Sequence, residues 1–271
     1  MVKVAFQGER GAFSEDAAAK LFGGDIDFFP CIRLKEVFEL VWQDKVEFGV
    51  VPVENSQAGS INETYDSLLA YSLNIFAEVI LKVSHCLMAL PGEKLADITT
   101  IYSHPQALAQ CDEFLTRLKV EIIPSYDTAG SAKMIKEKML RNCAAIASKR
   151  AADIYGLEIL ALEIETNVNN YTKFVAISKQ KAKPAQKNKT SLVFATEHKP
   201  GSLYRILGIF ATRNVNLTKL ESRPSRTKPW EYVFYADFEG HLDDEVCQEA
   251  VQELQTEAAF VKILGSYPQA T

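Results

Sequence analysis

A short stretch near the middle of the chain, Asn170–Phe174, carries an amide, a hydroxyl and a cation in the order Asn-Tyr-Thr-Lys-Phe. It stands at the start of an apolar strand pattern. A hydroxyl can assist the departure of an oxygen, and a lysine can hold a carboxylate. The stretch contains no conventional nucleophile with an adjacent base. It therefore indicates an enzyme that acts on a small anionic metabolite.

A second polar group lies in the loop Pro52–Glu63, directly after a predicted strand. Ser60 and Glu63 match the capping box S-x-x-E, which predicts that a helix begins there. Because a helix start offers unpaired backbone N–H groups, we expect the loop to bind an anion such as a carboxylate. Capping does not explain the four polar residues packed before it: Glu54, Asn55, Ser56 and Gln57.

A third polar loop, Ser103–Gln106, shows the capping pattern S-x-x-Q with proline in the first helical turn. Ser103 can cap its helix or contact a ligand, and the pattern leaves both roles open. Gln110 follows Gln106 by one helical turn and shares its face. His104 has no carboxylate neighbour in the sequence, so we expect a structural role for it.

Two further helix starts are predicted without a ligand role. The loop Gln7–Ser14 contains glycines that let a backbone approach a ligand, but their spacing is not G-x-G-x-x-G. Alone, this loop is a tight strand-to-helix turn. Asp127 is an ordinary N-cap candidate before Thr128.

The sequence lacks the motifs that mark several enzyme classes. There is no G-x-S-x-G elbow, phosphate loop or H-E-x-x-H pattern. The remaining polar residues are mostly neutral donors. Such a site suits a reaction whose driving force lies within the substrate, so that the enzyme need only hold it and assist a departing group.

Composition is that of a globular protein with room for two compact units. The 271 residues are 47% hydrophobic and 24% charged, and the net charge is −5. We expect no binding to nucleic acid or membrane, since no positive field attracts a polyanion. The amino terminus lacks a signal-peptide pattern, so we expect a cytoplasmic protein. The five cysteines and four histidines are scattered, and we expect neither a metal site nor another cofactor.

Residues 1–178 alternate apolar runs with helical patterns, which predicts an α/β fold with a largely parallel sheet. The predicted strands are Val2–Phe6, Phe48–Val53, Ile75–Val83, Thr100–Tyr102, Ala144–Ala147 and Phe174–Ile177. The predicted helices are Ser14–Phe22, Leu34–Asp44, Ile61–Tyr71, Pro105–Leu118, Thr128–Leu140 and Lys149–Tyr155.

A lysine-rich run, Lys179–Lys189, follows these elements and is predicted to be a solvated linker that joins no core. Beyond it, residues 190–271 show the order βαββαβ of a ferredoxin-like domain. Its predicted elements are Thr190–Thr196, Ser202–Thr212, Asn216–Ser222, Glu231–Phe238, Asp244–Glu257 and Phe260–Ser266.

The polar motifs together resemble those of the prephenate dehydratase family. The matching stretches are Phe6–Glu15, Val51–Ser60, Ser103–Cys111, Asp127–Ala132 and Asn170–Phe174. The resemblance implies a two-lobed catalytic domain of the type II periplasmic-binding-protein kind over residues 1–180. Its lobes would be residues 1–80 with 160–180, and residues 81–159. A linker at 181–189 and an ACT regulatory domain at 190–271 would follow.

The resemblance also implies the activity and the residues that perform it. Prephenate would lose carbon dioxide and its ring hydroxyl to give phenylpyruvate, in phenylalanine biosynthesis. The implied catalytic residues are Thr172, Asn55, Gln110, Ser103 and Glu54. The implied substrate-binding residues are Lys173, Ser56, Ser60, Asn170 and Phe174.

One position departs from the family. The usual motif is Thr-Arg-Phe, whereas this chain has lysine at position 173. Arginine grips a carboxylate through two parallel bonds, and lysine is a compact point charge. The exchange would loosen substrate binding if the side chain contacts substrate, and would be nearly silent if it pairs with a protein carboxylate.

The ACT resemblance implies feedback inhibition by phenylalanine and assembly into a homodimer or homotetramer. The implied effector residues are Gly201, Ser202, Leu203, Glu221, Ser222, Arg223 and Pro224. Two alternatives stay open. The chain could be a non-catalytic small-molecule sensor, or an enzyme whose substrate is arogenate, the amino-acid analogue of prephenate.

Overall fold

The computed structural model describes residues 1–225 and 231–270. The chain forms two compact units. The first contains Met1–Thr64 and Val79–Phe174, and the second contains Tyr65–Glu78 and Val175–Thr271. All the catalytic and substrate-binding residues expected from the sequence therefore belong to the first unit, and the expected effector residues belong to the second.

The first sheet has the strand order β2-β1-β3-β11-β5, with the short strand β4 paired to β3. β1 pairs in parallel with both β2 and β3. Residues 4–6 and residues 50–51 are fully buried, as expected for central strands that are covered on both faces. The strands are β1 Val2–Gln7, β2 Ile26–Cys31, β3 Phe48–Asn55, β4 Gly59–Ser60, β5 Asn74–Lys82 and β11 Tyr171–Ser178.

The second sheet has the order β10-β6-β9-β7-β8 and is mixed. β7 runs parallel to β8 and β9, whereas β6 runs antiparallel to β9 and β10. The prediction of a largely parallel sheet is therefore wrong for this half. The strands are β6 Cys86–Ala89, β7 Thr100–Ser103, β8 Glu121–Pro124, β9 Cys143–Ala147 and β10 Glu158–Ala161.

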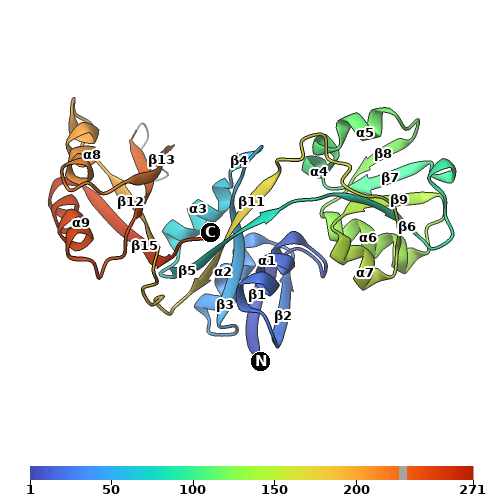
Figure 1. Ribbon diagram of the computed structural model, residues 1–271, viewed down its shortest axis with the longest axis horizontal. Coiled ribbons are helices and arrows are strands. Elements are labelled where there is room, and N and C mark those ends of the chain that lie inside the picture. Colours follow the sequence, from blue (N-terminus) through green and yellow to red (C-terminus); the bar gives the residue numbers. More distant parts are fainter. Residues whose placement is uncertain (226–230, 271) are drawn as a thin grey trace. The chain divides into compact units, whose positions relative to one another are not determined.

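The mixed direction follows from the way the chain joins the two sheets. It leaves the first sheet after β5 to enter β6 and returns from β10 to β11 (Figure 1). The two connections lie side by side, since the backbone N–H of Val83 donates to the carbonyl of Asn170 over 2.8 Å. Two sheets joined by such a double crossover form the two lobes of a type II periplasmic-binding-protein fold, so the expected fold class is confirmed.

Helices of the first unit cover both sheets. On the second sheet, alternate residues of β6 and β9 face opposite sides. Met88 and Ala145 pack on one side with α6 and α7, and Leu87 and Ala144 pack on the other with α4 and α5. These helices are α1 Phe13–Phe22, α2 Leu34–Trp42, α4 Pro105–Gln110, α5 Asp112–Thr116, α6 Thr128–Lys138 and α7 Lys149–Tyr155, with the 3-10 turn Leu95–Asp97 before β7. The helix α3 Asn62–Ala70 begins in the first unit and lies mostly in the second.

The helix predicted over 105–118 is interrupted. Cys111 leaves the helical conformation, at φ −106° and ψ 17°, and α5 begins after it. The Cys111 side chain is fully buried in the apolar core beneath both helices. The break places Gln110 at the last position of α4.

Both predicted capping boxes are wrong. Ser60 lies in β4, opposite Glu54, and α3 begins two residues later at Asn62. The cap of α4 is His104, whose Nδ1 accepts from the backbone N–H of Gln106. By contrast, Asp127 caps α6 as predicted, because its carboxylate accepts from the N–H of Gly130 over 3.0 Å.

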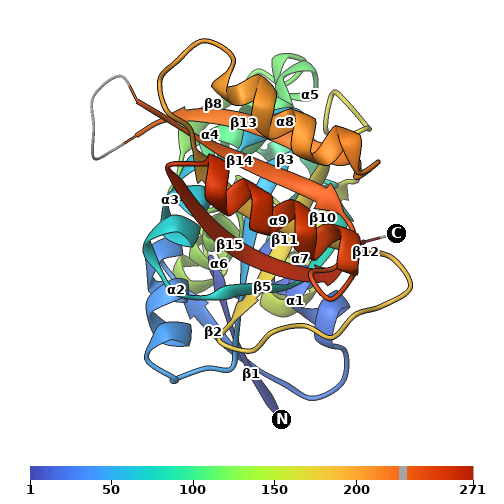
Figure 2. The same ribbon diagram turned by 90° about the vertical axis from the view of Figure 1, so that its left-hand side faces the viewer.

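The second unit contains a ferredoxin-like domain in the predicted order βαββαβ, with the sheet order β13-β14-β12-β15. Helices α8 and α9 cover one face of the sheet (Figure 2). Their apolar side chains, including Phe210 and Leu254, form a core with Phe194 and Phe238 of the strands. The elements are β12 Asn188–Ala195, α8 Ser202–Thr212, β13 Leu217–Pro224, β14 Tyr232–Glu239, α9 Glu245–Glu257 and β15 Phe260–Pro268.

The end of the predicted linker is not solvated. Lys189 lies in β12 and is 5% exposed. Its ammonium group donates to both carboxylate oxygens of Glu78, over 2.8 and 2.9 Å. The sequence could not show this, because the partner of a buried charge lies far away in the chain. A buried charge requires such a partner.

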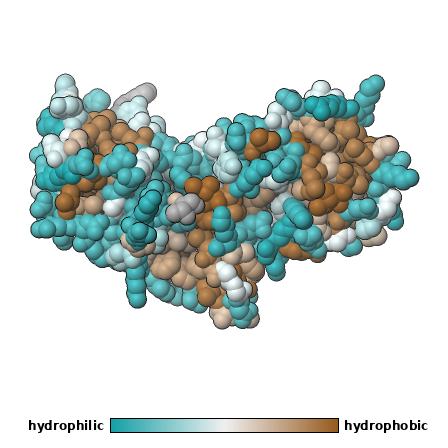
Figure 3. Space-filling model, viewed as in Figure 1, coloured by the Kyte–Doolittle hydropathy of each residue, from teal (hydrophilic) through white to brown (hydrophobic). Residues whose placement is uncertain are grey.

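Polar and apolar side chains share the surface in the view of Figure 3. On this face, hydrophilic areas alternate with apolar patches. Among residues 1–225 and 231–270, no helix is long and apolar enough to cross a membrane. All the cysteines are free, and only Cys143 is partly exposed, as is typical of cysteines that act as small hydrophobic residues.

The two lobes approach each other closely at Gly11. It has φ +88°, and a Cβ atom there would lie 2.7 Å from the Cα of Ala151 in the other lobe. Gly92 has nearly the same φ, +87°, with no atom within 4 Å of its Cβ position. Gly11→Ala should therefore lower the free energy of unfolding by about 1–3 kcal/mol more than the control Gly92→Ala. Urea unfolding of both variants measures the difference, and equal losses would contradict the close approach.

Candidate active site

A cavity of about 170 Å³ lies in the first unit, where the double crossover meets the helix starts of both lobes. We call it the threonine cavity, because Thr172 contributes to its wall. Its lining combines side-chain amides, two histidines and apolar residues. The lining residues are Phe13, Ser14, Pro52, Asn55, Ile61, Val83, His85, His104, Gln106, Ala107, Gln110, Thr128, Thr172 and Phe174.

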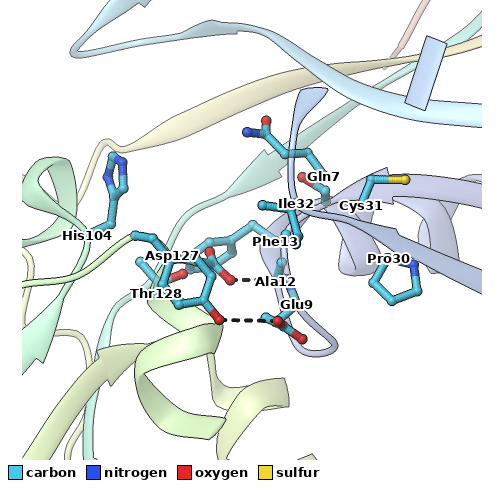
Figure 4. A pocket seen from close by; sticks show the side chains of 13 residues that line it. Gln7, Glu9, Ala12, Phe13, Pro30, Cys31, Ile32, His104, Asp127 and Thr128 are labelled. Carbon is cyan, nitrogen blue, oxygen red and sulfur yellow. Dashed lines mark hydrogen bonds between the residues drawn. The ribbon is translucent and has the colours of Figure 1, made fainter. Parts of the chain in front are cut away.

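A second cavity, of about 290 Å³, shares part of this lining and is called the loop cavity. Phe13, Ser14, His104 and Thr128 line both cavities. Figure 4 shows the loop cavity, with His104, Asp127 and Thr128 on one side and the Gln7–Phe13 loop on the other. The two cavities are therefore neighbouring parts of one cleft between the lobes of the first unit.

Asn55 occupies a fixed orientation at the end of β3. Its side-chain oxygen accepts from the backbone N–H groups of Gln57 and Ala58, over 3.1 and 2.9 Å. Because backbone N–H groups can only donate, this oxygen cannot exchange places with the amide nitrogen. The Asn55 nitrogen must therefore face β11, where it acts as a donor.

The hydroxyl oxygen of Thr172 accepts a hydrogen bond from the Asn55 nitrogen. The Asn55 nitrogen lies 2.9 Å from the Thr172 hydroxyl oxygen and 2.8 Å from the side-chain oxygen of Asn170. The Thr172 oxygen thus accepts a hydrogen bond from the protein. Its own hydrogen has no acceptor among residues 1–225 and 231–270, and the side chain lines the cavity. The hydroxyl can therefore donate to a bound ligand.

The hydrogen-bond chain continues into the other lobe. Because the Asn170 oxygen accepts from Asn55, its nitrogen must be the atom that donates to the Gln110 side-chain oxygen, over 3.1 Å. The same Gln110 oxygen lies 2.9 Å from Nε2 of His85. Asn55, Asn170 and Gln110 were all expected in the site, and the structure brings them together.

His85 was not expected there. It follows β5, is 2% exposed and packs edge-on against the Phe13 ring, with centroids 5.6 Å apart. Burial lowers the pKa of His85, although its hydrogen bond to Gln110 and the nearby Glu165 oppose the shift. No sequence motif marks it, because its partners come from distant segments that meet only in the folded chain.

Glu54 and Lys173 form an ion pair beside the cavity. The Lys173 ammonium lies 3.4 Å from a Glu54 carboxylate oxygen, and both side chains are partly exposed. Neither residue is among those that line the threonine cavity. Of the two roles left open for Lys173, this geometry matches pairing with a protein carboxylate.

The Ser56–Ser60 turn does not form the expected anion cradle. The N–H of Ser56 donates to the carbonyl of Tyr171, and the next two N–H groups donate to Asn55. The Ser56 hydroxyl bonds Asn169 and Tyr171, which fixes the start of β11. These groups serve the protein and leave little donor capacity for a ligand.

Free donors lie instead at the start of α1. No side chain caps this helix, whose first residues, Phe13 and Ser14, line both cavities. An uncapped helix start attracts an anion through its N–H groups and its dipole. The glycine-containing Gln7–Ser14 loop, interpreted from the sequence as a simple turn, therefore forms part of the site. The sequence signals were its glycines and its place in the family stretch Phe6–Glu15.

Ser103 lies outside the lining of the threonine cavity, whereas Phe174 belongs to it. The Ser103 hydroxyl is fully buried and donates to the carbonyl of Ile146 over 2.6 Å, which ties β7 to β9 outside the cavity lining. Phe174 is 3% exposed and forms part of the cavity wall. The structure thus gives Ser103 a supporting contact and Phe174 an apolar contact surface.

The carboxylates at the loop cavity are already paired. Glu9 bonds both Tyr126 and Lys133, over 3.1 and 3.0 Å. Asp127 accepts from the backbone N–H of Glu9 over 3.1 Å, which joins the two lobes. With these carboxylates paired, the backbone N–H groups at the start of α1 can donate to an anion.

In the second unit, Gly201 caps α8 at φ +81°, where glycine is favoured, and Ser202 begins the helix. Leu203 packs partly against the apolar core. Four expected effector residues, Glu221–Pro224, form the end of β13. Arg223 pairs with Asp66 over 3.1 Å, and Glu221 pairs with Lys219 over 3.2 Å.

The fold and the cavity define a class of protein. A two-lobed α/β domain with a cleft between its lobes offers a site for a small molecule, and a ferredoxin-like domain follows it. Residues 4–182 match the family described as prephenate dehydratase, and residues 190–255 match the ACT domain. The chain belongs to the prephenate dehydratase family.

Curated relatives agree with this family. The Arabidopsis thaliana chloroplastic protein arogenate dehydratase/prephenate dehydratase 2 is 44% identical and aligns with 100% of this chain and 74% of its own length. The bifunctional chorismate mutase/prephenate dehydratase of Aquifex aeolicus is 38% identical over 99% of this chain and 74% of its own.

Solved structures also match. Prephenate dehydratase from Arthrobacter aurescens, in complex with L-Phe, has a TM-score of 0.91 and 32% identity, covering 99% of this chain and 90% of its own. A protein described as GqqA, a novel type of quorum quenching acylase, has a TM-score of 0.90 and 34% identity, covering 99% and 98%.

The buried His85 predicts a dependence of stability on pH. Its ordinary pKa of 6.5 is lowered in the folded chain. The unfolded chain therefore binds a proton first as the pH falls, and folding loses stability below about pH 6.5. From about pH 7.5 to about pH 5.5, the melting temperature of the wild type should fall more than that of His85→Gln.

The exposed His198, replaced by glutamine, serves as the control for the loss of a histidine. Differential scanning calorimetry at both pH values gives the comparison. Parallel melting curves for wild type and His85→Gln would contradict the lowered pKa.

Proposed function

We propose that this protein is a prephenate dehydratase, converting prephenate to phenylpyruvate, carbon dioxide and water in phenylalanine biosynthesis. One observation carries the proposal. The Thr172 oxygen accepts from the fixed Asn55 amide, so its hydrogen is available to a ligand in the cavity. Family membership supplies the reaction to which this donor is suited.

The reaction needs little from the protein. Loss of the ring carboxylate as carbon dioxide releases an electron pair, which expels the ring hydroxyl as the ring becomes aromatic. Hydroxide is a poor leaving group, so a hydrogen bond or proton at that oxygen lowers the barrier, by about 10²–10⁴ in rate for a well-placed acid. A threonine hydroxyl is a weak acid, so Thr172 acts as a stabilising donor or as part of a proton relay.

The cleft offers places for the rest of the substrate. The uncapped start of α1 provides N–H groups suited to one carboxylate. Phe13 and Phe174 give apolar contact surfaces for the ring. The amide nitrogen of Gln110 offers a further neutral donor. These groups bind and orient an anion without a strong base, as a reaction driven by the substrate requires.

Arogenate is the main alternative substrate. The Arabidopsis relative is named for both arogenate and prephenate, and the Aquifex relative for prephenate. Incubation of the purified protein with each compound separates the two, since prephenate yields phenylpyruvate and arogenate yields phenylalanine. Absence of both products would favour a non-catalytic sensor.

The acylase description of one structural relative suggests hydrolysis as another candidate. Acyl transfer to a protein side chain needs an activated nucleophile beside a base. In this cleft the Thr172 oxygen faces an amide donor, and the Ser103 hydroxyl donates to a main-chain carbonyl. The dehydratase reaction therefore fits this site better.

Regulation and assembly complete the proposal. An ACT domain and a relative solved with L-Phe support phenylalanine as the effector, held by residues 201–203 and 221–224. The edge strands of this sheet, β13 and β15, support pairing into a homodimer or homotetramer. The family matches at 4–182 and 190–255 support a catalytic domain at 1–180 and an ACT domain at 190–271. The cytoplasmic location stays a prediction.

Thr172→Val tests the catalytic donor. Valine keeps the shape but removes the hydroxyl, so kcat with the accepted substrate should fall by about 10²–10⁴. The matched variant Thr172→Ser keeps the donor and should retain much more activity. Circular dichroism should show both variants folded, because Asn55 keeps its bond to Asn170. Wild-type turnover by folded Thr172→Val would refute the role.

Lys173→Arg tests the ion pair. Because Lys173 pairs with Glu54 at a partly exposed position, an arginine should substitute for it with little effect. Such pairs contribute about 0–1 kcal/mol, so kcat/KM should change less than about fivefold. Steady-state kinetics gives the answer, and a large drop in KM would show that residue 173 contacts the substrate instead.

A further inference from the structure

His85 stands at the end of the hydrogen-bond chain that begins at Asn55. We propose that His85 is a positioning residue, which holds the Gln110 amide with its two N–H hydrogens facing the substrate. The inference rests on the proposed function, because it concerns the same reaction. It assigns a task to a buried histidine that no motif of the sequence indicates.

The direction of every bond in the chain is forced. Two backbone N–H groups fix the Asn55 oxygen, so its nitrogen donates to Asn170. Asn170 must then donate from its own nitrogen to the Gln110 oxygen. Since an oxygen receives that bond, the Gln110 amide has its oxygen inward and its nitrogen free for the cavity.

His85 provides the second bond that holds this orientation. Its Nε2 lies 2.9 Å from the Gln110 oxygen, which already accepts from Asn170. Nε2 must therefore carry the hydrogen. If Gln110 flipped, its nitrogen would face two donors, His85 and Asn170, and both bonds would be lost. Two converging donors thus exclude the flipped amide.

His85 is itself held rigidly. Its backbone N–H donates to Glu165 over 2.9 Å, and its ring meets the Phe13 ring at 84°. Nδ1 is buried and has no partner among the described residues. With the hydrogen on Nε2, the neutral ring leaves only a lone pair there, so no buried N–H group stays unpaired. Burial lowers the pKa of His85, which favours this neutral form.

Gln110 then contributes donors at the place where charge must be bound. Its side chain lines the threonine cavity together with Thr172. The free amide nitrogen has two hydrogens, and no described residue accepts them. They suit an oxygen of an anionic substrate. A flipped Gln110 would present an oxygen instead and repel the same group.

A double-mutant cycle tests whether His85 acts through Gln110. The variants are His85→Leu, Gln110→Ala and the combination, assayed for kcat/KM with the accepted substrate. We expect His85→Leu to lower kcat/KM by on the order of 10- to 100-fold in the wild-type background. In the Gln110→Ala background, the same change should cost less than about threefold.

Two polar variants distinguish positioning from simple packing. In His85→Gln the amide nitrogen can take the place of Nε2, so most activity should return. In His85→Asn the shorter side chain reaches only the Nδ1 position, and activity should stay low. The comparison of His85→Gln with His85→Asn distinguishes positioning from packing even if His85→Leu fails to fold. Melting temperatures of all variants are measured beside the kinetics.

The inference would be overturned if the losses of kcat/KM from His85→Leu and Gln110→Ala multiplied in the double variant. It would also be overturned if His85→Gln and His85→Asn lowered kcat/KM equally. A wild-type protein that turns over neither prephenate nor arogenate would overturn the proposed function, and this inference with it. An active wild type with multiplicative losses would overturn only the role of His85.

Discussion

The site depends on two backbone N–H groups, those of Gln57 and Ala58, that donate to the side-chain oxygen of Asn55. Backbone donors cannot reverse, so the Asn55 amide has one permitted orientation. That orientation makes Thr172 an acceptor toward the protein and a donor toward the ligand. Through Asn170 it also sets the direction of the bonds to Gln110 and His85. The turn after Asn55 thus determines which groups in the cleft donate hydrogen bonds and which accept them.

The fold makes this arrangement possible by topology. β3 and β11 are neighbours in the first sheet although more than a hundred residues separate Asn55 from Thr172. The return connection from the second lobe delivers Asn170 beside the outgoing connection, which carries His85. Gln110 reaches the same place because α4 ends at the break before Cys111. Elements of the two lobes therefore position Asn55, Thr172 and Gln110, and the connections between the lobes position Asn170 and His85.

Much of this could be predicted from the sequence, because local patterns specify local structure. The ferredoxin-like order, the start of α6 at Asp127 and the polar stretch at Thr172 all followed from periodicity and residue type. Long-range partners could not be predicted. The buried pair of Lys189 and Glu78, the role of His85 and the antiparallel direction of β6 depend on segments that meet only after folding. The capping patterns misled because Ser60 and Ser103 have partners outside their helices.

The directed hydrogen-bond chain is the central claim, and the tautomer of His85 tests it most directly. Two-dimensional ¹⁵N–¹H correlation spectra of the imidazole rings, with His85→Gln to assign the signals, report which nitrogen carries the hydrogen. The account predicts a neutral His85 ring at neutral pH, with the hydrogen on Nε2, facing the Gln110 oxygen. A ring protonated only on Nδ1 would mean that Nε2 accepts from Gln110, and the predicted direction of the chain would be wrong.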